Sequence, residues 1–530
     1  MISYDVTPEG YRHWALLIEP PVATLTLGPD GETGDNGDGT DDFDAQLSAL
    51  LRVDIELFDA LQRLRFEYPD IRAVVVTGGS DEAFRTGIAG IPPGAASDVA
   101  ANVWTFRNEL RCAIEDASAN SGQYWLTALN GSASGPGYEL ALATDEIVLV
   151  DDGRSAVALP AASAPGEFPP ASALVRLVDK RHVRPDVVDA FCAAPGGVSG
   201  DRAVDWGLVD LTAPERCFRS VVGDRALRLC RAAGTTRRGP ASEAVELGPL
   251  WREEFDGGFA YPNMRVELDR DACEAALTIV GPSNQECFAP EPGPRRLRSH
   301  WWPLAVCREL DDALLRLRSH RPEVRSLILR TEGDPLAVAS ADVALMSGYE
   351  HDWFVREVVL YWRRTLKRFA LAWQSVFALV ESGSCFVGTL LELAFAADRI
   401  YMVDGTAPDD PERAPAEIFL TGMNFGPLPQ ANGLCRLESR FRTRADHLAA
   451  LAQRVGDPIR AAEAAELGLV TEAMVPAEWE DRIRQAIKER AGLTLGARAG
   501  LAVTVHTAGP QTLETKIFGR HPRGASGTSR

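Results

Sequence analysis

A glycine-rich turn that leads into a carboxylate is the segment of this chain best suited to chemistry. Gly135 and Gly137 precede Glu139, at the start of a helix expected over residues 138–144. The first backbone N–H groups of a helix have no partner within it, and the helix dipole favours an anion there. Glycine allows close approach to the backbone, and a carboxylate one turn further on can move a proton or activate water. The segment therefore indicates stabilisation of an oxyanion beside an acid–base group.

The cysteine and histidine patterns favour neither a metal centre nor a disulfide framework. Nine cysteines are scattered without a C-x-x-C pair, and the eight histidines show no metal-binding spacing. An odd number of widely spaced cysteines predicts reduced thiols, as in the cytosol. Cys112 and Cys385 are interpreted as buried thiols because no histidine lies beside either in the sequence.

Length and charge exclude several classes of protein. At about 150 residues a domain, the 530 residues could form about three or four units. The net charge of −20 argues against nucleic-acid binding, which normally needs a basic face. No apolar run approaches the roughly 18 residues of a membrane span, and no secretory signal is apparent at Met1. We therefore expect a cytoplasmic protein that binds neither nucleic acid nor membrane.

The chain repeats itself at a shift of about 253 residues, and such repeats indicate duplicated structural units. The shift stays nearly constant over about 130 residues and then drifts, so that Gly207 meets Gly468. The paired positions include Glu56 and Glu309, Asp59 and Asp312, Arg63 and Arg316, Gly135 and Gly388, Glu139 and Glu392, and Asp145 and Asp398.

Strand and helix patterns alternate within the first copy. Apolar and β-branched runs predict strands, and leucines at helical spacing between Val53 and Leu64 predict a helix that ends before Pro69. This alternation indicates an α/β fold with right-handed crossovers. The expected strands cover residues 22–27, 72–77, 124–129 and 146–150.

The sequence is interpreted as four parts, namely two folded units, a linker between them and a tail. We expect a first unit over residues 1–230 that carries the candidate active site, and a second unit over 271–518. The Arg-, Gly- and Pro-rich residues 231–270 are interpreted as a linker with some local structure, and 519–530 as a flexible tail. The acidic, glycine-containing residues 30–44 are interpreted as a mobile surface loop.

Several segments resemble signatures of the crotonase (enoyl-CoA hydratase/isomerase) superfamily. They are A-L-N-G-S-A-S-G-P-G-Y-E-L-A-L-A-T-D-E-I at residues 128–147, V-V-V-T-G followed by A-F-R-T-G at 83–87, and G-L-V near 207 and 468. The resemblance covers nearly the whole chain and implies a tandem duplication of crotonase-like ββα-superhelix units with helical caps. Residues 114–122, 381–389 and 514–520 resemble the branch that acts on ring-oxidised aromatic acyl-CoA thioesters.

The resemblance assigns catalytic roles in the first copy. Glu139 would be the acid–base that positions water, with the structural carboxylate of a helix N-terminus as the alternative. Glu115 is a candidate partner carboxylate. Arg85 would place a cation near the acyl group, unless it turns to solvent or to a phosphate.

The resemblance also assigns the residues that would hold the substrate. The oxyanion hole would use the N–H of Ile88 and the position of Pro136, with Gly137 as a neighbour. Gly87, Gly135 and Ala161 would line the substrate site.

Four positions depart from the superfamily pattern. Pro136 has no N–H, and loss of one oxyanion donor typically lowers the rate by about 10²–10³. Ala161 stands where many hydratases have a catalytic glutamate, and Arg85 stands where a small or thiol residue is usual. Residues 169–173 are proline-rich where the superfamily prefers a glycine-rich loop.

The second copy resembles a catalyst less closely. Ser340 occupies the position of Gly87, and Thr389 occupies that of Pro136. We interpret this copy as mainly structural.

The expected function is that of an acyl-CoA thioester lyase or hydrolase that opens an oxidised aromatic ring with water and releases formate. No metal or other cofactor is expected, because the thioester itself accepts the electrons, and a homodimer is expected by analogy. Two alternatives stay open. One is a diverged paralogue with a different thioester reaction in specialised biosynthesis, and the other is a catalytically decayed binding or scaffold protein.

Overall fold

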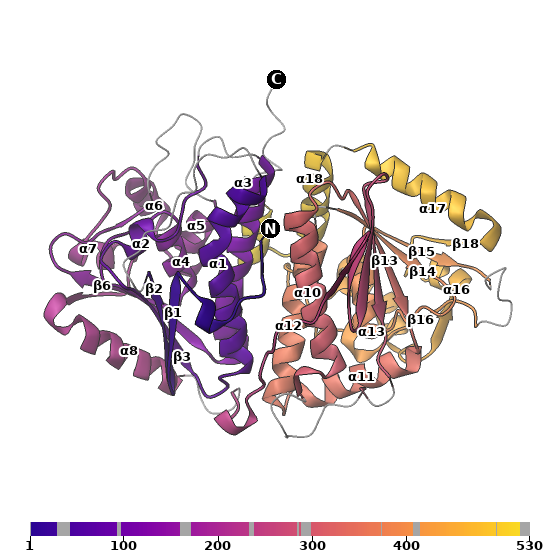
Figure 1. The fold of residues 1–530 in the computed structure, drawn as a ribbon, viewed down its shortest axis with the longest axis horizontal. Helices are drawn as coiled ribbons and strands as arrows, with labels where there is room; N and C mark the ends of the chain where they lie inside the picture. Colours follow the sequence, from indigo (N-terminus) through magenta and orange to yellow (C-terminus); the bar gives the residue numbers. More distant parts are fainter. Residues whose placement is uncertain are drawn as a thin grey trace. The chain divides into compact units, whose positions relative to one another are not determined.

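The computed structural model divides the chain into two compact units, built mainly from Met1–Glu246 and Leu247–Thr515. The structure describes residues 2–28, 43–92, 97–159, 171–232, 238–283, 286–287, 298–372, 374–405, 414–493 and 495–519. Each unit contains one large sheet with helices packed against it (Figure 1). The α/β class expected from the sequence is confirmed.

The first unit is built on a six-stranded sheet in the order β1-β2-β3-β4-β6-β8. β1 and β2 form an antiparallel hairpin, and the other neighbours are parallel. The expected strands at 22–27 and 124–129 coincide with β2 and β4. The bounds are β1 Trp14–Glu19, β2 Val22–Leu27, β3 Ala73–Gly78, β4 Tyr124–Leu129, β6 Glu146–Asp151 and β8 Leu211–Pro214.

Helices cover both faces of this sheet because its central strands are apolar on both sides. α1 (Phe43–Phe66) and α3 (Ser97–Asp116) lie side by side over one face, and α8 (Phe218–Ala232) covers the other (Figure 1). Val74 packs into the core with α1, whereas Val75 packs into the core with α8. The remaining elements are η1 Pro8–Gly10, α2 Ala83–Thr86, η2 Ala117–Ser121, β5 Ala133–Ser134, α4 Pro136–Ala143, β7 Val157–Ala158, α5 Ala171–Val175, η3 Arg176–Lys180, α6 Pro185–Cys192, α7 Gly200–Asp205, η4 Glu215–Cys217 and η5 Ala241–Glu243.

The second unit repeats this plan with an eight-stranded sheet in the order β18-β15-β14-β13-β12-β11-β10-β9. The β11–β12 hairpin corresponds to β1–β2, and the four strands beyond it are parallel. The bounds are β9 Glu253–Phe255, β10 Gly258–Tyr261, β11 Met264–Asp269, β12 Glu274–Val280, β13 Ser326–Glu332, β14 Ser375–Val380, β15 Arg399–Val403 and β18 Glu472–Met474.

In the second unit, α10 and α12 pack together as α1 and α3 do in the first. Among the residues that the structure describes, no helix combines the length and the apolar character needed to cross a bilayer. The elements are α10 Trp302–His320, α11 Pro335–Gly348, α12 Trp353–Ala370, α13 Gly388–Ala396, β16 Glu417–Phe419, η6 Gly422–Asn424, α14 Arg436–Arg440, α15 Ala445–Ala452, β17 Pro458–Arg460, α16 Ala461–Glu466, α17 Pro476–Ala491, α18 Leu495–His506 and α19 Leu513–Phe518.

The linker interpretation of residues 231–270 is wrong over its second half. β9, β10 and β11 occupy this stretch and extend the second sheet, with Phe259 and Val266 buried. Gly257, with φ +92°, forms the turn between β9 and β10, so its presence marked a hairpin and not a linker.

Two other expected segments fall largely outside the description. α1 begins at Phe43, so the last residues of the expected 30–44 loop are helical. The rest of that loop and the tail from residue 520 lie outside the described residues.

Both units share a polar cluster that contains two of the repeated residue pairs. In each copy an aspartate on the first long helix accepts hydrogen bonds from a tyrosine outside that helix and from an arginine one helical turn later. Such buried donors need an acceptor, which explains why the three residue types recur together. The members are Tyr11, Asp59 and Arg63 in the first unit, and Tyr261, Asp312 and Arg316 in the second.

Removal of this acceptor is expected to destabilise the second unit. Asp312→Ala leaves Arg316 and Tyr261 without their shared carboxylate, and loss of one partner of a buried ion pair costs about 3–5 kcal/mol. Urea denaturation followed by circular dichroism measures the effect. Asp186→Ala, which removes an exposed ion pair with Arg184, is the control and should leave the midpoint unchanged. Equal midpoints for the two variants would contradict the prediction.

Candidate active site

The candidate site begins at Gly135, whose backbone has a positive φ that favours glycine. Gly135 has φ +50° and is the N-cap of α4, so an L side chain there would be strained. Pro136 follows at the first helical position, where its missing N–H removes no helix bond. The next residue, Gly137, presents an N–H that has no partner inside the helix. The local sequence thus opens α4 with an N–H donor at Gly137.

Close packing holds this helix start against α2. A Cβ built on Gly137 would lie 2.0 Å from the backbone oxygen of Phe84, so only glycine fits. Gly87 ends α2 and donates its N–H to the Ala83 oxygen at 2.8 Å. Ile88 follows directly and is buried. The structure therefore packs α2, which ends two residues before Ile88, against the start of α4.

Among the described residues, space remains beside Gly135 itself. A Cβ built there would meet no described atom within 4 Å. Ala161, the remaining residue assigned to the substrate site, lies outside the described residues.

Glu139 lies in the first turns of α4 and forms a buried ion pair. Its Oε2 accepts a hydrogen bond from Arg111 Nη1 at 2.7 Å, and its side chain is 8% exposed. Burial lowers the pKa of Arg111, although the charge of Glu139 opposes that effect. Within the described part of the chain, Oε1 of Glu139 makes no hydrogen bond. Glu139 can therefore accept one further hydrogen bond.

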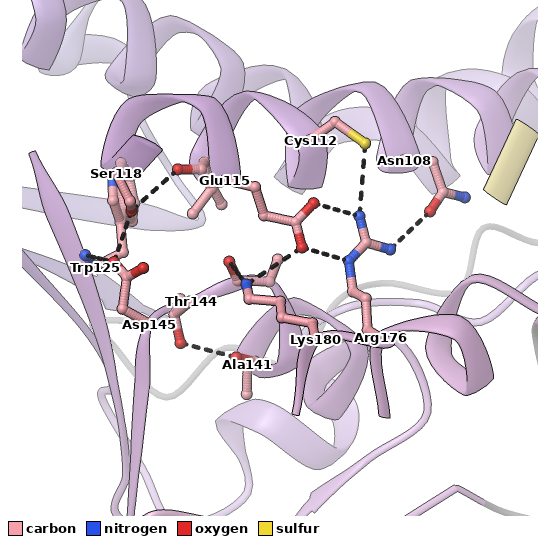
Figure 2. A network of polar contacts seen from close by, with 12 residues as sticks. Asn108, Cys112, Glu115, Ser118, Trp125, Ala141, Thr144, Asp145, Arg176 and Lys180 are labelled. Atoms are coloured by element: carbon pink, nitrogen blue, oxygen red, sulfur yellow. Dashed lines mark hydrogen bonds and ion pairs between the residues drawn. The ribbon is translucent and has the colours of Figure 1, made fainter. Parts of the chain in front are cut away.

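Glu115 is instead fully engaged by two cations (Figure 2). Arg176 binds both of its oxygens, at 2.9 and 3.1 Å, and Lys180 Nζ lies 3.2 Å from Oε1. Burial alone raises the pKa of Glu115, but the two cations outweigh it and hold the pKa below its ordinary value. Arg176 donates from its remaining nitrogen, Nη1, to Asn108 Oδ1, and its Nη2 also contacts Cys112 Sγ. This arrangement joins α3 to η3 and leaves neither oxygen of Glu115 without a hydrogen bond.

The second unit neutralises its equivalent glutamate with a different arginine. Glu392 Oε2 accepts from Arg436 at 2.9 Å, and Oε1 accepts from Asn424 at 2.8 Å. Arg436 and its following leucine match Arg176 at a shift of about 260 residues. In the second copy Arg368 stands at the position that corresponds to Glu115. Arg436 therefore has no carboxylate at that position to pair with, and it pairs with Glu392. Both oxygens of Glu392 are satisfied and its side chain is 0% exposed.

Arg85 does not join this cluster. Its side chain is 55% exposed and pairs with Glu82 on α2. Sequence reasoning missed Arg111, Arg176 and Lys180. The signal for Arg111 was present, because it lies one helical turn before Glu115 on α3. Among the described residues, no group of three or more His, Cys, Asp or Glu could hold a metal ion.

We expect Glu115→Gln to destabilise the first unit by about 3–5 kcal/mol at neutral pH, because it leaves buried cations unpaired. The folded pKa of Glu115 lies below the unfolded value of 4.5, so its contribution is complete above that value and is lost as the pH falls through the lowered one. Urea denaturation at a series of pH values measures the difference between wild type and variant.

Glu146→Gln is the matched control, because the pair of Glu146 with Arg225 is more exposed than that of Glu115 with Arg176. Its cost should be about 0–1 kcal/mol. A difference between wild type and Glu115→Gln that stays constant into strong acid would refute the ion-pair account.

Several known proteins resemble this chain over part of its length. Residues 48–238 match the family described as enoyl-CoA hydratase/isomerase. Carnitinyl-CoA dehydratase of Citrobacter koseri is 26% identical over 167 residues, covering 31% of this chain and 60% of that protein. The crystal structure of enoyl-CoA hydratase from Bacillus anthracis is 20% identical, covers 41% of this chain and 76% of its own, and gives a TM-score of 0.31.

One similarity extends over almost the full length. Benzoyl-CoA-dihydrodiol lyase of Aromatoleum evansii is 41% identical over 523 residues, which cover 98% of this chain and 91% of that protein. The expected crotonase fold and the expected branch of the superfamily are thereby confirmed. The chain belongs to the benzoyl-CoA-dihydrodiol lyase family, within the enoyl-CoA hydratase/isomerase superfamily.

Proposed function

We propose that the first unit binds the CoA thioester of an oxidised aromatic acid, opens its ring with water and releases formate. The observation that carries this proposal is the start of α4, where a positive-φ glycine with open space beside it stands near a carboxylate with one uncommitted oxygen. The 41% identity to benzoyl-CoA-dihydrodiol lyase supports the choice of an aromatic acyl group.

The thioester oxygen would bind at the start of α4. The N–H groups of Ile88 and Gly137 are the proposed donors, since Pro136 has none. Negative charge that develops on the oxygen is stabilised by these donors and by the positive end of the helix dipole. The expected rate loss from Pro136 is avoided because the next residue in the same turn supplies the donor.

Glu139 would orient and deprotonate the attacking water through its Oε1. Arg111 holds the other oxygen, so the carboxylate stays fixed in direction while it accepts a proton. Arg111 is thus a positioning residue, and Glu115 and Arg85 take no direct part. The thioester carbonyl serves as the electron sink, so the proposal needs no cofactor.

Glu139→Gln should lower kcat by at least about 10²-fold, because the amide cannot take the proton. The assay detects formate and the acyl-CoA product by mass spectrometry after incubation with the epoxide of benzoyl-CoA. Glu146→Gln serves as the control and should keep wild-type turnover. Unchanged turnover in Glu139→Gln would refute the proposed role.

Calorimetry with benzoyl-CoA separates this proposal from its rivals. Absence of any acyl-CoA binding would favour a scaffold protein, and turnover of other thioesters alone would favour a diverged paralogue. The homodimer expected by analogy is tested by light scattering.

Pro136→Ala tests which residue donates to the thioester oxygen. The substitution adds an N–H at the first helical position, where the chain already has a free donor at Gly137. We expect kcat to stay within about threefold of wild type, well below the 10²–10³ effect of a true oxyanion donor. A rise of tenfold or more in steady-state assays would show that the missing N–H of residue 136 limits the enzyme.

A further inference from the structure

The second unit keeps the backbone of the first unit's helix start. Gly388 has φ +42°, close to the +50° of Gly135, and lies at the start of α13 as its first residue, whereas Gly135 is the N-cap of α4. Thr389 takes the place of Pro136 and does have an N–H. By its backbone alone, this copy is therefore the better equipped of the two to bind an anionic oxygen.

In the second unit the buried carboxylate of Asp342 lies where such an anionic oxygen would bind. Asp342 of α11 accepts the Thr389 N–H at 3.0 Å and the Thr389 hydroxyl at 2.6 Å. The Thr421 hydroxyl donates to the same carboxylate at 2.8 Å. Asp342 is almost fully buried, and burial raises its pKa to about 6, while these hydrogen bonds oppose that rise.

The two units differ in what lies beside this glycine. A Cβ built on Gly388 would lie 1.7 Å from Asp342 Oδ2, whereas a Cβ built on Gly135 meets no described atom within 4 Å. Since the two glycines share nearly the same φ, the carboxylate of Asp342 fills a space that the described residues of the first unit leave open. Gly388 is required in its own unit because no side chain could share that space.

We propose that Asp342 is a built-in occupant of an anion cradle formed by Gly388, Thr389 and Thr421, and that the cradle binds small carboxylates once this side chain is removed. In the native chain the second unit then takes no acyl-CoA thioester at this helix, which leaves one acyl-CoA site per chain. The statement about acyl-CoA rests on the proposed function, and the statement about small carboxylates does not.

The donors define the ligand. One N–H and two hydroxyl groups bind the two oxygens of a single planar carboxylate in the manner seen for Asp342. The nearby Glu392 is already paired with Arg436 and Asn424 and so is not available as a competitor. Because the donors are neutral, the affinity for a free carboxylate should be weak, in the millimolar range.

Asp342→Ala with added formate tests the cradle, because formate restores the group that the substitution removes. The variant should melt below wild type, and sodium formate should raise its melting temperature in a saturable way, by about 3 °C at about ten times Kd. Wild type, whose cradle is filled, should gain nothing beyond the effect of sodium chloride at the same ionic strength.

Asp334→Ala is the matched control. Asp334 lies at the start of the same helix and also accepts a backbone N–H, but it is exposed. Formate should not rescue this variant. Equal stabilisation of both variants, or equal stabilisation by chloride, would overturn the proposal.

Two further measurements keep the proposal testable if Asp342→Ala does not fold. Asp342→Ser keeps one hydroxyl in the cradle, and its melting temperature should show the same dependence on formate, whose absence would overturn the cradle. Calorimetry of the wild-type chain with benzoyl-CoA should give one site per chain, and two sites would overturn the statement about acyl-CoA. Absence of benzoyl-CoA binding together with formate rescue would refute the proposed function and leave the cradle intact.

Discussion

A glutamate buried at the start of a central helix has to be neutralised, and the candidate site depends on how each half of the chain does this. Glu139 and Glu392 both lie four residues after a positive-φ glycine. An unpaired carboxylate at such depth would cost more than the surrounding packing could offset. Arg111 binds one oxygen of Glu139, whereas Arg436 and Asn424 bind both oxygens of Glu392. Of the two glutamates, Glu139 keeps a hydrogen-bonding position open among the described residues.

Duplication followed by small changes in side chains explains the different outcomes. A carboxylate at residue 115 draws Arg176 away from the central glutamate, and Arg368 at the matching position of the second copy leaves Arg436 free to reach it. Six strands in corresponding order and the shared Asp–Tyr–Arg cluster occur in both copies, and the second sheet adds β9 and β10. A conserved backbone therefore carries two different charge arrangements.

Features that depend on residues close together in the sequence were predicted well. The strands at 22–27 and 124–129 match β2 and β4, because an apolar run bounded by turn residues is a local signal. The same local logic failed at residues 231–270. Glycine and charged residues there belong to hairpin turns and to the exposed face of short strands, and composition does not separate these from a linker.

The sequence by itself determined the duplication, the α/β class, and the position of Glu139 behind a glycine-rich helix start, because periodicity and backbone conformation are set by residues close together in the chain. Only the tertiary structure decided which cation each carboxylate meets. Arg111 and Glu139 are 28 residues apart, and Arg176 and Glu115 are 61 apart. Whether such side chains meet depends on how helices pack across a shared core. The pairing occupies both oxygens of Glu115 and, among the described residues, one oxygen of Glu139.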